Sequence, residues 1–280
     1  MRPISSSARS VRPHPQAQAD SRRLGRLAWS LTIVIATLGQ PVEAQTRYTT
    51  AQFDSARFRH IAHSEIQTTI AGRERRERVA VVGLLVVHAS PGAGDTIRLE
   101  AWYDSLEVRR SSSGGTLTPD TDGMIGGRFR GRLASGGVYV ADARPFVPDG
   151  VAEVIDLSRV LEEFFPILAG RSLRAGQRWS GPEGLEIRRL SDSLAPDTLL
   201  RFRAIRTRTS DSVTAAGDSA AIPARQTTRE EEQFAWHQRR GLVRRSRTIV
   251  VETSIPGGGT VGRPVRSRVE QHIVVERLPR

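Results

Sequence analysis

The chain has 280 residues, of which 38% are hydrophobic, and its formal net charge is +12 at pH 7. This length and apolar fraction suit one large β-rich domain better than two small ones. Cysteine and lysine are both absent, which excludes disulfide bonds, thiolate metal sites, thiol nucleophiles and Schiff-base lysines.

The positive charge comes entirely from arginine, and asparagine is absent as well. Lysine and asparagine share AA-starting codons, so this usage indicates a bacterium with a G+C-rich genome. The arginines are scattered along the chain, and only 5% of the residues are aromatic. Nucleic-acid binding favours a clustered basic surface with stacking side chains, so we do not expect it here.

The first 44 residues have the pattern of a signal peptide. A basic region that ends at Arg26 is followed by an apolar run over residues 27–38, too short to span a bilayer comfortably. Val42 and Ala44 supply the small residues expected before cleavage at Gln45. We predict export to the periplasm or the extracellular space, with no transmembrane span after cleavage; the alternative is an uncleaved anchor helix.

Residues 45–280 are predicted to form a single β-rich domain. Residues 79–88 are its most apolar stretch, and their β-branched side chains around Gly83 indicate a buried strand with room for a bulge. Residues 73–78 alternate in charge and are expected to be a solvated strand end, while 111–127 should be a surface loop. The strands predicted in this half are 53–70, 79–88, 96–109, 129–133 and 138–141.

One helix is predicted, near residues 155–165. Its apolar residues have the spacing of a single helical stripe that faces a core. Asp156 is placed as the N-cap, and Pro166 should end the regular helix near Phe164. The stripe consists of Leu157, Val160, Leu161, Phe164, Phe165 and Leu168.

The second half of the chain again alternates between polar and apolar residues. Five strands are predicted there, at 185–190, 199–209, 225–237, 242–254 and 265–278. With about nine or ten strands and no βαβ rhythm, the fold class is mainly β. We predict a curved antiparallel sheet or half-barrel with one wet and one dry face, wrapped around the single amphipathic helix.

The stretch from Phe164 to Trp179 resembles a group of uncharacterised secreted bacterial β-sheet proteins. These carry an "F-P-x-L" run followed by a "v-x-x-G-x-x-W" turn, which Gly176 and Trp179 match, whereas Gln177 and Arg178 depart from the usual residues. Residues 234–243 are similar to a strand pair of the same group. More loosely, the chain resembles half-barrels of the periplasmic lipoprotein-carrier type. The resemblance implies a fold and no catalytic residue.

We predict no catalytic residue, metal site or cofactor. His60 and His63 lie three apart, so on a strand they point to opposite faces. His88, His237 and His272 lie in different predicted strands and can meet only if the fold brings them together. The run Glu230-Glu231-Glu232 is expected to form a modest surface pattern of ion pairs with Arg244, Arg245 or Arg247 on the next strand.

Function is predicted only in outline. Aromatic side chains, among them Tyr103 and Phe234, either line an apolar cavity or fill a core. We predict a non-enzymatic envelope protein that binds or carries a lipid, another apolar ligand or an envelope protein. The alternative is a hydrolase whose Asp, Glu, His or Ser residues converge in the fold. The predicted ligand-binding residues are Trp102, Leu157, Leu161, Phe164, Trp179 and Trp236.

Overall fold

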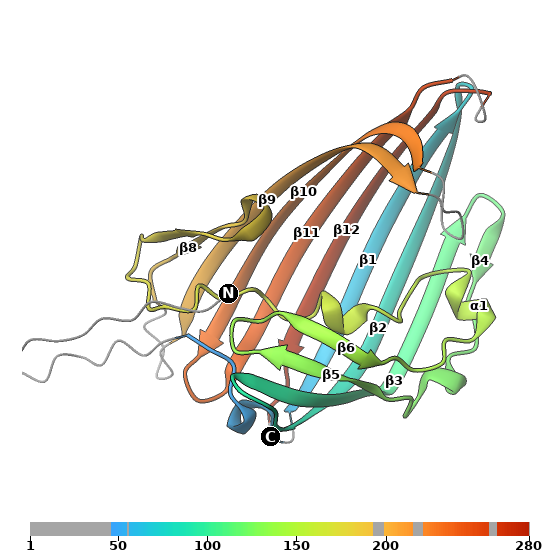
Figure 1. Cartoon of the computed structure of the whole chain (residues 1–280). Coiled ribbons are helices and arrows are strands. Elements are labelled where there is room, and N and C mark those ends of the chain that lie inside the picture. Colours follow the sequence, from blue (N-terminus) through green and yellow to red (C-terminus); the bar gives the residue numbers. More distant parts are fainter. Residues whose placement is uncertain (1–45, 55, 193–198, 215–220, 258–261, 280) are drawn as a thin grey trace, which may run out of the picture. The chain divides into compact units, whose positions relative to one another are not determined.

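A computed structural model describes residues 46–54, 56–192, 199–214, 221–257 and 262–279 (Figure 1). The predicted signal peptide, residues 1–44, lies outside these residues, and so does the alternative anchor helix. No helix in the described ranges is long and apolar enough to cross a membrane.

The described residues form one antiparallel sheet of 12 strands. All of the predicted strands are present. The predicted number, nine or ten, was too low because β4 lies in the predicted loop at 111–127 and β7 is a very short strand around Trp179. The strands are β1 (Ala56–Ile70), β2 (Arg73–Pro91), β3 (Thr96–Ser112), β4 (Gly115–Leu117), β5 (Phe129–Ala134), β6 (Tyr139–Ala143), β7 (Arg178–Ser180), β8 (Glu186–Arg189), β9 (Leu200–Thr214), β10 (Ala221–His237), β11 (Gly241–Ile255) and β12 (Val265–Arg277).

Along the sheet the order is β6-β5-β3-β2-β1-β12-β11-β10-β9-β8-β7, with β4 beside β3. The first long strand therefore pairs with the last one, from Phe58 opposite Arg277 to Ile70 opposite Val265. The sheet is open, as far as the structure describes it, and its ends are the short strands β6 and β7. Short edge strands limit pairing with other chains.

Alternate residues of the long strands lie on two different faces. In β1, Phe58, His60 and Ala62 are buried, while Arg57 and His63 are exposed. We call the buried side the core face and the other side the open face. The alternation confirms the prediction that His60 and His63 point to opposite faces, and that one face is dry and the other wet.

The predicted helix at 155–165 is wrong. That stretch contains only the 3-10 turn η3 (Val160–Glu162), and the single α-helical turn, α1 (Asp149–Ala152), lies before it. Asp156 does not cap a helix, because its Oδ1 accepts bonds from the backbone N and Oγ of Ser158, at 2.9 and 2.6 Å. Between Asp156 and Pro166 a helix has roughly ten residues, which is marginal without support from its surroundings.

Residues 145–177 instead form an irregular segment, here called the crossing segment, that passes over the core face (Figure 1). The apolar stripe is buried as predicted except for Val160, which is half-buried; Leu157, Leu161 and Phe164 are at most 2% exposed. The Phe164 ring packs edge-on against that of Phe58 in β1, with centroids 5.2 Å apart. The remaining short helical turns among the described residues are η1 (Thr50–Phe53), η2 (Asp122–Met124) and η4 (Pro182–Gly184).

Gly83 in β2 makes room for the ring of Tyr103. A β carbon at Gly83 would lie 2.7 Å from Cε1 of Tyr103. With the glycine present, the Tyr103 hydroxyl lies 2.9 Å from Nδ1 of His60 on β1. The bulge predicted in the strand around Gly83 lies on the neighbouring strand instead: Leu84 pairs with Ser105 and Leu85 with Tyr103, so Asp104 of β3 is the extra residue.

Replacing Gly83 by Ala should lower the free energy of unfolding by about 1–3 kcal/mol, because the new methyl group displaces the buried Tyr103 ring. Urea denaturation measures this change. Gly136→Ala is the control, since a β carbon there meets no atom within 4 Å. Equal effects of the two substitutions would show that Gly83 is not needed for this packing.

Candidate functional site

A small hollow lies on the core face, between the crossing segment and the sheet. Its volume is about 150 Å³. The side chains around it are mostly apolar and come from strands β1, β2 and β12 and from residues 155–164. They are Ala62, Val81, Ile155, Leu157, Val160, Phe164, Ile273 and Val275, with His60, Asp156, Arg159, Glu163 and Gln271 as the polar members.

His60 is the buried polar side chain of this hollow. It is 4% exposed, and its Nδ1 lies 2.9 Å from the hydroxyl of Tyr103. Burial lowers the pKa of His60 from 6.5 to about 4 and raises the pKa of Tyr103 above its ordinary value. Both groups are therefore neutral at pH 7, and together they can offer only a neutral hydrogen-bonding contact to a ligand.

The carboxylates that line the hollow are already engaged. Asp156 accepts the two bonds from Ser158, and Oε2 of Glu163 lies 3.3 Å from Nη1 of Arg247. No nucleophilic serine belongs to the lining. His60, Asp156 and Glu163, three residues of the types named in the hydrolase alternative, line the hollow, and each already has a hydrogen-bond or ion-pair partner.

Beside the hollow, the core face carries a buried network of ion pairs. Glu230 of β10 accepts from three guanidinium groups, those of Arg206, Arg208 and Arg247, at 2.6 to 3.0 Å. Burial raises the pKa of Glu230, but the hydrogen bond from Arg206 and the charge of Arg247 outweigh it, and the pKa falls from 4.5 to about 2. Glu230 is thus ionised throughout the physiological pH range.

The network also holds the crossing segment. Nε of Arg245 donates to Glu232 at 2.7 Å, and Nη1 of the same guanidinium donates to the backbone carbonyl of Glu163. The predicted pairing of this glutamate run with Arg245 and Arg247 is confirmed. Its description as a surface pattern was wrong, because the side chains of Glu230 and Glu232 are at most 10% exposed.

The six predicted ligand-binding residues do not form one site. Leu157 and Phe164 line the hollow. Leu161 is buried beside them, and Trp236 lies in the core with its ring centroid 4.9 Å from that of Tyr48. The other two, Trp179 and Trp102, lie elsewhere.

Trp179 lies in β7, where its ring would meet a β carbon at Gly181. Trp102 is on the open face, under the guanidinium of Arg128, which lies 3.6 Å from the ring centroid. Of the other aromatic candidates, Tyr103 and Phe234 are buried in the core. For these two side chains and Trp236, the core interpretation holds.

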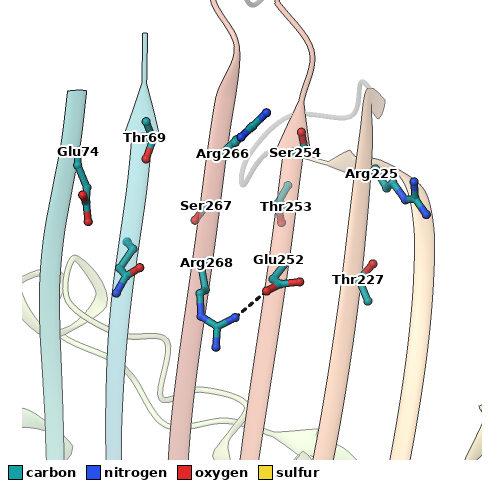
Figure 2. Close-up of a pocket in the computed structure, with 11 residues that line it drawn as sticks. Thr69, Glu74, Arg225, Thr227, Glu252, Thr253, Ser254, Arg266, Ser267 and Arg268 are labelled. Atoms are coloured by element: carbon teal, nitrogen blue, oxygen red, sulfur yellow. Dashed lines mark hydrogen bonds and ion pairs between the residues drawn. The ribbon is translucent and has the colours of Figure 1, made fainter. Parts of the chain in front are cut away.

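The open face carries shallow polar grooves that sequence reasoning missed. Figure 2 shows one of about 390 Å³, across strands β2, β1, β12, β11 and β10. In one cross-strand row Arg266 and Arg225 stand on either side of Ser254, and in the next row Arg268 binds Glu252 at 2.6 Å. Period-two alternation predicts that such residues face water, but only the strand register shows which of them meet.

Comparison with known proteins gives no family. No family model matches the chain, and no curated protein matches it. Among solved structures it is similar to lipovitellin, described for its lipid–protein interactions, with 11% identity and a TM-score of 0.41 over 81% of this chain and 25% of that one. It is also similar to the β domain of the Bordetella autotransporter BrkA, with 11% identity and a TM-score of 0.21 over 80% of this chain and 100% of that one. This chain spans about a quarter of the lipovitellin structure, and TM-scores this low support no conclusion about function.

Glu230→Gln should destabilise the protein by about 3–5 kcal/mol, because three guanidinium groups lose a buried counter-charge. The control is Glu231→Gln. Glu231 lies on the open face, half exposed and 2.9 Å from Arg203, so its loss should cost about 0–1 kcal/mol.

The ionised form of Glu230 stabilises the fold fully above pH 4.5, and this contribution is lost as the pH falls towards 2. Urea denaturation at pH 7 and pH 3 should therefore show a smaller gap between wild type and Glu230→Gln at pH 3.

His60 predicts a second pH dependence with its own window. Between pH 6.5 and about 4 the unfolded chain binds a proton that folded His60 does not bind, so stability falls as the pH falls. In this window the unfolding free energy of the wild type should drop by about 1 kcal/mol per pH unit more than that of His60→Gln. The exposed His63→Gln variant should follow the wild type, and a wild-type curve parallel to His60→Gln would contradict the prediction.

Proposed function

We propose that this protein is an exported, non-enzymatic binding module of the bacterial envelope, and that it holds one small apolar group in the hollow beneath the crossing segment. The group belongs either to a free ligand or to a side chain of a partner protein. The observation that carries the proposal is the hollow itself, an apolar opening of about 150 Å³ on the core face.

The volume limits the ligand. An apolar cavity of about 150 Å³ is known to accept a benzene-sized molecule, whereas drug-sized ligands occupy pockets of about 300–1,000 Å³. One aromatic ring or one branched alkyl group therefore fits, and a whole lipid chain does not. Of the predicted partners, a small apolar ligand or an apolar side chain of an envelope protein is supported better than a lipid.

The lining limits the chemistry further. Ala62, Val81 and Ile273 provide aliphatic contacts, and His60 provides a neutral polar contact at the base. A ring that carries one hydroxyl or N–H, such as a phenol, satisfies both kinds of contact at once. Asp156 and Glu163 at the hollow are already hydrogen-bonded, so a neutral group suits the mostly apolar lining better than a charged one, whose desolvation is costly.

The signal-peptide pattern of residues 1–44 supports an exported location, and the chain has no cysteine. Stability then comes from the core rather than from disulfide bonds.

Ligand titrations with toluene and phenol, followed by NMR of the protein, test the proposal. The wild type should bind one molecule of each, with phenol bound more tightly because of His60. Val160→Trp fills the hollow from its rim and should abolish binding of both. Ile167→Trp is the matched control, on the same segment but outside the lining. A wild type that binds neither probe, or a Val160→Trp variant that still binds both, would refute this function.

A further inference from the structure

His63 and His272 face each other on neighbouring strands of the open face. They are direct partners in the pairing of β1 with β12. Both side chains are exposed. Direct partners of an antiparallel pair have Cβ atoms about 4.5–5.5 Å apart, a separation at which two imidazoles can reach the same metal ion.

The next pair on the same face consists of two carboxylates. Glu65 lies opposite Glu270 and, like the histidines, on the open face, since each is two residues from one of them. Like charges placed directly opposite each other destabilise a sheet. Two histidines and two glutamates thus occupy a square of four neighbouring positions, in which a bound cation would relieve the repulsion.

The arginines near this square also pair with carboxylates outside it. Arg78 lies 3.8 Å from Glu65, and Arg268 lies 3.0 Å from Glu270 but also 2.6 Å from Glu252. Arg109 is paired with Glu107 at 2.9 Å. Arg109 and Arg268 are thus each bound to a carboxylate outside the square.

The square also has space above it. All four side chains line one hollow of about 450 Å³ on the open face. Because that hollow is separate from the apolar one beneath the crossing segment, a ligand here does not depend on the function proposed above.

We propose that His63 and His272, completed by a carboxylate from Glu65 or Glu270, bind a divalent transition-metal ion of the Zn²⁺ type. Imidazole and carboxylate ligands suit Zn²⁺ and its neighbours, whereas Ca²⁺ and Mg²⁺ prefer oxygen ligands alone. In the described structure no three such side chains already surround one point. Nε2 of His272 lies 3.2 Å from Oγ of Ser246 instead, so the ion must draw the exposed side chains together by rotation about their χ angles.

The test is Zn²⁺ titration of the full-length chain, purified without a polyhistidine tag, by isothermal titration calorimetry. Wild type should bind one Zn²⁺ per chain. His63→Ala and His272→Ala should each weaken binding by more than the ten- to hundredfold that loss of an outer-shell partner costs. The double variant Glu65→Gln with Glu270→Gln should weaken it as well. His88→Ala removes another exposed open-face histidine, outside this hollow, and should leave Zn²⁺ affinity unchanged.

Thermal unfolding gives a second readout. Zn²⁺ should raise the unfolding midpoint of wild type and of His88→Ala, since an ion that binds only the folded state stabilises it, and should not raise that of His63→Ala. Midpoints measured without metal check that the variants fold. Absence of Zn²⁺ binding by wild type, or equal Zn²⁺ affinity in wild type and His63→Ala, would overturn the proposal.

Discussion

The structure depends on how the crossing segment satisfies its backbone polar groups while it covers an apolar sheet face. Buried N–H and C=O groups need partners. The segment's own turns supply some of them, such as the bond from the N–H of Phe164 to the carbonyl of Leu161 at 3.3 Å. Residues outside the segment supply others. Arg245 donates to the carbonyl of Glu163, the hydroxyl of Tyr48 lies 3.3 Å from the carbonyl of Pro166, and the N–H of Leu168 donates to Gly136 at 2.8 Å.

The ion network follows from that requirement. A guanidinium brought under the crossing segment is itself costly to bury, so Arg245 needs Glu232, and Arg247 beside it needs Glu230. Such a network fixes position more than it adds stability, because each charge is balanced only in one arrangement. It holds the segment at Glu163, and the hollow lies next to this fixed point, between residues 155–160 and side chains of β1 and β12. The hollow is thus a consequence of where the segment is held.

Sequence reasoning predicted what depends on local alternation and missed what depends on distant partners. The strands, their two faces and the burial of Leu157, Leu161 and Phe164 all follow from which residues are apolar. The helix at 155–165 did not form. A spacing of three and four residues shows only that a stripe of side chains is buried, not that the backbone is helical. Backbone groups of the segment are hydrogen-bonded to Arg245 and Gly136, and no local pattern reveals these partners. Of the predicted site residues, only Leu157 and Phe164 line the hollow.

The pairing of β1 with β12 is another feature that local sequence patterns do not predict. Hairpin neighbours such as β1 and β2 can be inferred from a short turn, but β1 and β12, the first and last strands of the described residues, meet only in the folded sheet. That register decides whether His63 meets His272 or a different residue, because a slip of one position would turn one strand's side chains to the other face. Burial of the core face therefore fixes which residues meet on the open face. As long as Phe58, His60 and Ala62 stay buried, the register of β1 cannot slip. His63 and Glu65 then stay opposite His272 and Glu270, on a rigid strand rather than on a loop.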